Sequence, residues 1–122
     1  MRDKIIQDRT RLQERYLQDD LLTRLGGLAT NLARIQSFSH HSGNQAAVER
    51  LLEESKLFIE WTAGEVDIDS AAELVTMQIQ LARWQRNWQS LWADTAQRIK
   101  MAEQARVWSE RVLELSGILS RH

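Results

Sequence analysis

Hydrophobic residues recur along this chain at alternating steps of three and four, which is the spacing of one face of an α-helix. In the first stretch, residues 2–38, the second half carries a regular apolar stripe of Leu21, Leu25, Leu28, Leu32 and Ile35. Gly26 and Gly27 interrupt this stripe, and each costs a helix about 1 kcal/mol relative to alanine. We expect one helix here, in which the two glycines mark either a tolerated weak point or the close crossing of another helix.

A second helix is expected over residues 45–62. The segment before it, residues 39–44, contains a glycine and polar turn-forming residues, so it is predicted to be a loop. Ser42 or Asn44 can cap the helix, and Gly64 follows its last turn, where helices commonly end. Its apolar residues are Val48, Leu51, Leu52, Leu57, Phe58, Ile59 and Trp61. This wide apolar surface predicts that the helix is covered on more than one flank.

The second half of the chain contains neither glycine nor proline from Glu65 to Arg111. Ser70 and Glu73 match the capping-box pattern, so we expect a helix to begin there. The apolar stripe changes face near residues 94–100. Either the helix continues while its partner changes, or it breaks with Asp94 or Thr95 as the cap. Because no glycine or proline marks a break, we expect one continuous helix over residues 70–116.

A helix of that length would be roughly 70 Å long, about twice the diameter of a compact chain of this size. Its second half would leave an apolar stripe in water unless it doubled back into a four-helix bundle or a second subunit covered it. We expect the second subunit, and hence a homodimer. The candidate association surface is Trp92, Met101, Trp108, Val112 and Leu115.

The predicted fold is therefore all-α, with residues 1–122 in a single domain. It is an elongated antiparallel bundle of three long helices, or of four if the last helix breaks near residues 94–100. The composition agrees with a helical domain, since the chain has 43% hydrophobic residues, 27% charged residues and no proline.

Charge and composition also limit the binding partners and the cellular location that we expect. A formal net charge of −1 argues against a nucleic-acid binder that relies on overall phosphate attraction. No stretch approaches the roughly 20 apolar residues of a membrane span, and the start of the chain lacks the apolar core of a signal peptide. The absence of cysteine excludes disulfides, thiolate chemistry and iron–sulfur clusters. We expect a cytoplasmic protein that binds neither nucleic acid nor membrane.

Residues that could carry catalytic or metal chemistry are sparse. The histidines His40, His41 and His122 do not form the Glu-x-x-His motif of metal-binding bundles, and no third ligand accompanies them. No glycine-rich phosphate loop is present. The carboxylates have basic partners four residues away, as on a solvated helix surface. We therefore expect no catalytic residue, no metal, no cofactor and no enzymatic activity.

The five tryptophans are the unusual feature of the composition. They either fill the bundle core or line a groove for a planar apolar or anionic small molecule. The candidate groove residues are Trp61, Trp84 and Trp88, with Arg83 beside them to meet a ring or an anionic group. The function we expect is a non-enzymatic interaction or scaffold module that self-associates. The alternative is a ligand-binding bundle that uses this groove.

Two stretches carry a resemblance. NQAAVERLLEESKLFIEW, residues 44–61, and ELVTMQIQLARWQRNW, residues 73–88, resemble small uncharacterised helical proteins of cyanobacteria. The resemblance implies a bacterial cytoplasmic setting. It implies no activity, and no catalytic or binding residue can be carried over from it.

Overall fold

Residues 2–120, the part that the computed structural model describes, form six α-helices and two short 3-10 turns, and this part contains no strand. The helices are α1 (Arg2–Gln18), α2 (Leu21–Phe38), α3 (Gln45–Thr62), α4 (Ile68–Arg86), α5 (Trp88–Ala93) and α6 (Thr95–Ser120). The turns are η1 (Ser42–Asn44) and η2 (Ala63–Glu65). The predicted all-α class is confirmed. Within this part, no helix is both long and apolar enough to cross a membrane. His122 lies outside the described residues.

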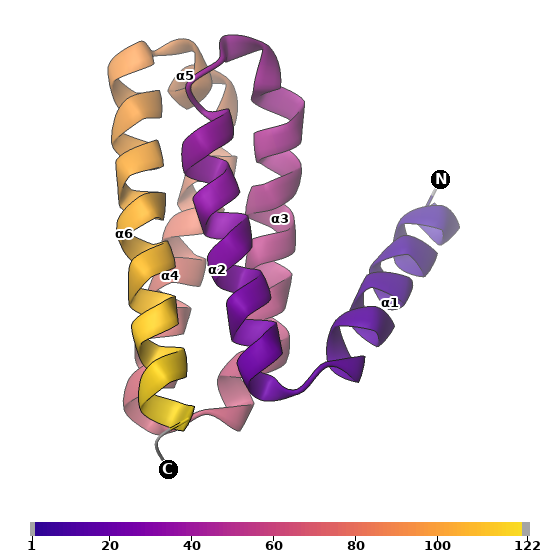
Figure 1. The fold of residues 1–122 in the computed structure, drawn as a ribbon. Helices are drawn as coiled ribbons and strands as arrows, with labels where there is room; N and C mark the ends of the chain where they lie inside the picture. The colour runs from indigo at the N-terminus through magenta and orange to yellow at the C-terminus, as the bar shows by residue number, and fades with distance from the viewer. Residues whose placement is uncertain (1, 121–122) are drawn as a thin grey trace.

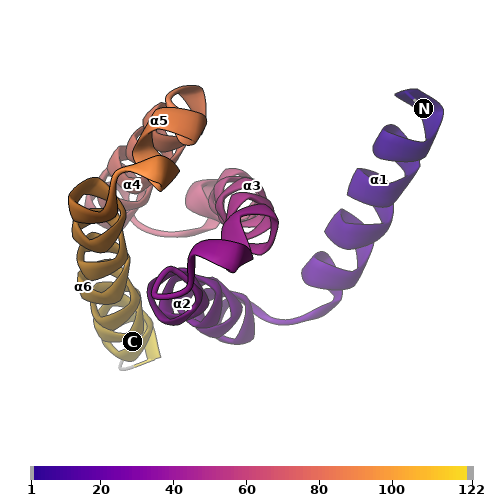
Figure 2. The same cartoon turned by 90° about the horizontal axis from the view of Figure 1, so that it is seen from above.

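Four helical columns form the bundle, namely α2, α3, α4 continued by α5, and α6 (Figure 1). Helix α2 packs against both α6 and α3, and α3 packs against α4. Helix α1 stands apart from the bundle (Figure 2). It is anchored near its end by Tyr16, whose ring stacks on Phe58 of α3 with 4.0 Å between centroids and whose hydroxyl donates to the Arg24 carbonyl at 2.9 Å.

The single helix predicted over residues 2–38 is wrong, because the chain breaks between α1 and α2. Asp20 adopts an extended backbone, and its carboxylate accepts a hydrogen bond from the Thr23 backbone N–H at 2.8 Å. This N-cap begins a new helix without a glycine or a proline. The two glycines lie within α2, and a Cβ added at Gly26 would meet nothing within 4 Å. A Cβ added at Gly27 would meet the Tyr16 ring of α1 at 3.9 Å, an ordinary contact distance, so neither position requires a glycine for a close helix crossing.

The continuous helix predicted over residues 70–116 is also wrong. It is divided at Asn87 and again at Asp94, which has an extended backbone and whose carboxylate accepts from the Gln97 N–H at 3.2 Å. The break near residues 94–100, the alternative left open above, is the observed arrangement. The start of α4 differs as well. Asp67 caps it by accepting from the Ser70 N–H at 3.1 Å, so Ser70 is not the cap.

Because of the break at Asp94, α6 doubles back and packs along α2 (Figure 1). Its apolar stripe is sheltered within one chain, with Met101 2%, Val112 0% and Leu115 4% exposed. The stripe that was expected to need a second subunit is therefore not left in water. The exposed stripe from which a dimer interface on these residues was predicted is not observed.

Candidate binding groove

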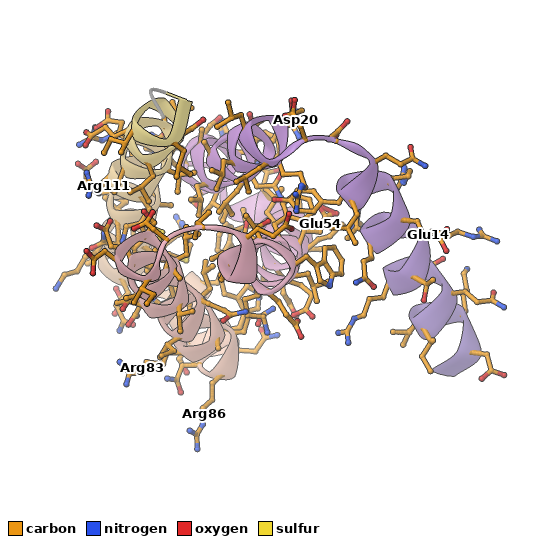
Figure 3. The ribbon with its side chains drawn as sticks, turned by 90° about the horizontal axis from the view of Figure 1, so that it is seen from below. Glu14, Asp20, Glu54, Arg83, Arg86 and Arg111 are labelled. Atoms are coloured by element: carbon orange, nitrogen blue, oxygen red, sulfur yellow. The ribbon has the colours of Figure 1, made fainter. Side chains whose placement is uncertain are left out.

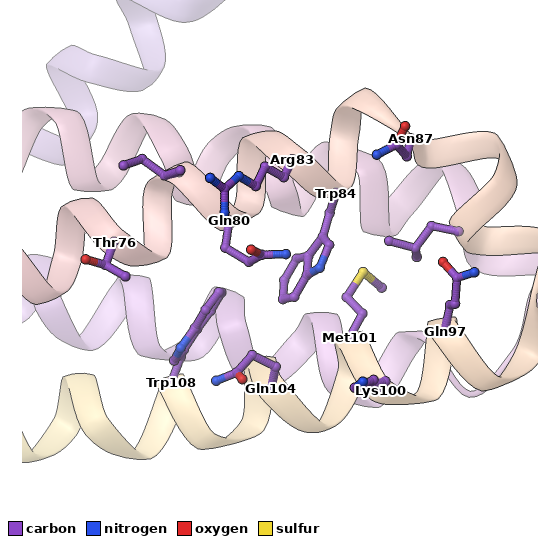
Figure 4. Close-up of a pocket in the computed structure, with 12 residues that line it drawn as sticks. Thr76, Gln80, Arg83, Trp84, Asn87, Gln97, Lys100, Met101, Gln104 and Trp108 are labelled. Atoms are coloured by element: carbon purple, nitrogen blue, oxygen red, sulfur yellow. The ribbon is translucent and has the colours of Figure 1, made fainter.

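The seam between α4 and α6 is held at both ends and open in the middle. At one end, the guanidinium of Arg111 on α6 donates to both carboxylate oxygens of Glu73 on α4, at 2.7 and 2.8 Å. At the other end, α5 and the turn at Asp94 join the two columns. Between these ends lies a groove of about 1010 Å³, lined by residues of α4, α5 and α6 together with Asn87 (Figure 4).

A pair of indoles from opposite walls lies inside the groove. Trp84 of α4 and Trp108 of α6 are stacked, with 5.2 Å between ring centroids and 29° between planes. Met101 of α6 lies beside them (Figure 4). Trp108 is half-buried, so part of its indole remains open to a molecule entering the groove. Trp84 is only 9% exposed, so Trp108 supplies most of the apolar ring surface against which another ring can stack.

The groove is positively charged. Its charged lining residues are Arg83 and Lys100, one from each wall, and no carboxylate lines it. Neither makes an ion pair with another residue of the described part, whereas Arg24, Arg106 and Arg111 are all paired. The remaining polar lining residues are neutral: Thr76, Gln80, Asn87, Gln97 and Gln104. Two uncompensated cations flanking an apolar cleft favour an anionic occupant.

A smaller cavity of about 430 Å³ continues the seam toward the Arg111 end and shares Thr76, Gln104 and Trp108 with the groove. Its carboxylates are engaged in ion pairs. Hydrogen bonds from Arg111 hold the pKa of Glu73 below its usual value, so this carboxylate stays ionised and bound to its partner. The seam is therefore closed by salt bridges at this end, and the uncompensated positive charge lies in the larger groove.

The structure brings together some of the candidate ligand-groove residues and separates the others. Trp84 and Arg83 both line the groove. Trp88, on α5, is buried against Trp92 with 5.2 Å between centroids. Trp61, on α3, lies beside Tyr16 at 5.9 Å, in contact with α1. These last two tryptophans belong to separate clusters and do not line the groove.

The candidate association residues lie elsewhere than expected. Trp108 and Met101 line the groove. Trp92, Val112 and Leu115 are buried in the core. The Trp92 indole N–H donates to the Ser42 carbonyl at 2.8 Å, which ties α5 to the loop after α2. None of these three is available on the surface of the chain.

Sequence reasoning missed the polar lining of the groove. Lys100 and Gln104 lie eight and four residues before Trp108, and Gln80 lies four residues before Trp84. Residues at these spacings share one face of a helix. Counting in steps of four from each tryptophan could therefore have identified these polar residues. The sequence does not show that the Trp84 face of α4 meets the Trp108 face of α6, because this contact depends on α6 folding back.

Comparison with protein-family models, with curated proteins and with solved structures finds no match to this chain. The resemblance to cyanobacterial helical proteins stays a prediction. The lining of the groove itself offers an aromatic ring for stacking, apolar contact, amide groups for hydrogen bonds and two positive charges.

Proposed function

We propose that this protein is a non-enzymatic binding module whose α4–α6 groove holds a planar aromatic anion. The observation that carries the proposal is the stacked pair Trp84–Trp108 flanked by two cations that have no counter-charge. The groove, at about 1010 Å³, lies at the upper end of the roughly 300–1,000 Å³ typical of small-molecule sites.

In this function, the ring system of the ligand lies against Trp108 and the exposed edge of Trp84, and its anionic group lies between Arg83 and Lys100. Stacking on an aromatic ring contributes about 0.5–1.5 kcal/mol beyond the area buried. Because both cations are exposed, water screens their attraction, and they contribute more to the choice of an anion than to overall affinity. The neutral amides of Gln80 and Gln104 are in place to orient polar substituents.

The test compares three compounds that share one ring system and differ in charge: an anion, a neutral compound and a cation. Pyrene-1-sulfonate, neutral pyrene-1-methanol and a pyrene trimethylammonium salt are titrated into the protein while quenching of tryptophan fluorescence is followed. We expect the sulfonate to bind most tightly and the cation most weakly. Equal affinity for all three, or no quenching at all, contradicts the proposal.

Matched variants locate the site. Arg83→Ala and Lys100→Ala are each expected to weaken sulfonate binding about threefold to fivefold and to leave the neutral compound unaffected. Arg86→Ala removes a neighbouring exposed arginine that does not line the groove and should change neither. Trp108→Leu should weaken all three compounds, whereas Trp61→Leu should weaken none. An Arg86→Ala effect as large as that of Arg83→Ala rejects the groove as the site.

The second candidate function, self-association as a scaffold, is favoured by a different observation. The interface first expected for it consists largely of core residues, but α4 presents an apolar face to solvent.

A further inference from the structure

The outer face of α4 carries an exposed apolar row at coiled-coil spacing. The row advances in steps of four, three, four and three: Ile68, Ala72, Val75, Ile79 and Ala82. All five are exposed, with Ile68 at 86%, Ile79 at 49% and Val75 at 39%. Single apolar residues on a surface are ordinary, but a continuous row at this spacing is the seam along which one helix packs on another.

The row has the symmetry that self-pairing requires. From Ala72 to Ala82 its steps are three, four and three, so it reads the same in both directions about Met77. A second α4 laid antiparallel places Val75 of one copy opposite Ile79 of the other, and Ala72 opposite Ala82. The small alanines allow the two helices to approach closely at those layers. The two-fold axis that relates the two copies crosses the outer face of α4 at the level of Met77, whose own side chain is buried in the core.

Charges along α4 select the antiparallel orientation. Its first turn carries Asp69, and its last turn carries Arg83 and Arg86, which project from α4 (Figure 3). Antiparallel pairing brings Asp69 of each copy near Arg83 and Arg86 of the other, whereas parallel pairing aligns like charges. None of these three side chains makes an ion pair within the described part of the chain. Their charges are therefore free to act between copies.

We propose that the outer face of α4 is the interface of a homodimer in which two copies of this chain pair their α4 helices antiparallel. The contact is one helix pair of 19 residues, roughly 28 Å long, so it is a small interface. The inference does not depend on the groove ligand. It does share Ile79 and Arg83 with the groove, so an anion bound there competes with the other copy for these residues and shifts the equilibrium toward monomer.

Sedimentation equilibrium without ligand tests the mass. The apparent molecular mass is expected to rise with protein concentration from the 14.2 kDa of one chain to twice that value. Val75→Asp should raise the dissociation constant at least tenfold. Ile99→Asp, which changes an exposed isoleucine of α6 outside the row, should not alter it. Circular dichroism checks that both variants keep their helix content. A mass of one chain at every concentration, or equal effects of the two variants, overturns the proposal.

Cysteine cross-linking tests the orientation, since the native chain has no cysteine. In the antiparallel dimer, position 75 of each copy lies opposite position 79 of the other, so a mixture of Val75→Cys and Ile79→Cys should form a mixed disulfide dimer under mild oxidation. Ala72→Cys alone should not form a disulfide with itself, because disulfides need Cα atoms within about 7 Å. A mixture of Ala72→Cys and Ala82→Cys should give the mixed dimer. Self-linking at positions 72 and 82 would indicate parallel pairing and overturn the proposal, as would no cross-link in any of these samples.

Discussion

At the scale of single residues, two buried serines differ in what their hydroxyls meet. Ser109 of α6 donates to the Ala29 carbonyl of α2 at 2.7 Å, so it joins two helices across the bundle. Ser55 of α3 is fully buried, and its hydroxyl has no hydrogen-bond partner among the described residues. A buried polar group without a partner loses its hydration and gains nothing in return.

This difference predicts opposite outcomes for the same substitution. Ser109→Ala removes a hydrogen bond and should lower the free energy of unfolding by about 1 kcal/mol. Ser55→Ala removes only an unpaired hydroxyl and should leave that free energy unchanged or raise it by up to about 1 kcal/mol. Urea denaturation of both variants beside the parent measures the two values. Equal losses in both would contradict the assignment of Ser55 as unpaired.

At the scale of elements, helix ends next to a glycine were predicted correctly, whereas helix ends caused by a capping aspartate were predicted poorly. The predicted helix over residues 45–62 matches α3, because a glycine-containing loop precedes it and Gly64 follows it. The break at Asp20 was not predicted, and the break at Asp94 was predicted only as the alternative, because neither is marked by a glycine or a proline. A carboxylate that caps the next helix ends the preceding one equally well.

The same error limited the prediction of the site. Trp84 and Arg83, both named as candidate groove residues from the sequence, do line the groove. The pairing of Trp84 with Trp108 could not be predicted from the sequence, because it requires α6 to return along α4 after Asp94. A hydrophobic stripe identifies the buried face of a helix, but it does not identify the helix that covers it.

The turn before α6 therefore carries a prediction. Asp94→Ala removes the acceptor of the Gln97 N–H and should lower the free energy of unfolding by about 1 kcal/mol. Asp94→Asn retains a capping oxygen and should restore most of the loss. Thr95→Ala, which alters an exposed neighbour in the same turn, serves as the control. Chemical denaturation compares the three, and an Asp94→Ala effect no larger than that of Thr95→Ala would exclude a capping role.

At the scale of the whole molecule, two ion pairs tie together segments that are far apart in sequence. Arg24 of α2, itself buried, donates to both carboxylate oxygens of Glu65 in η2, at 2.6 and 2.8 Å. Arg111 of α6 makes the corresponding pair with Glu73 of α4. Hydrogen bonds from these arginines hold the pKa of both carboxyls below the ordinary value of 4.5.

These lowered pKa values fix the sign of the pH dependence. Between the folded and the ordinary pKa, the unfolded chain binds more protons than the folded chain, so stability rises with pH in that window. The stabilisation from Glu65 and Glu73 is complete above about pH 5 and is lost as the pH falls below about 4.5. We expect the urea midpoint to fall on acidification from about pH 5 to 3. The combined variant Glu65→Gln and Glu73→Gln should start from a lower midpoint at neutral pH and fall less steeply, because its amides do not titrate. A midpoint that rises on acidification, or a variant that falls as steeply as the parent, would show that these pairs do not govern the acid response.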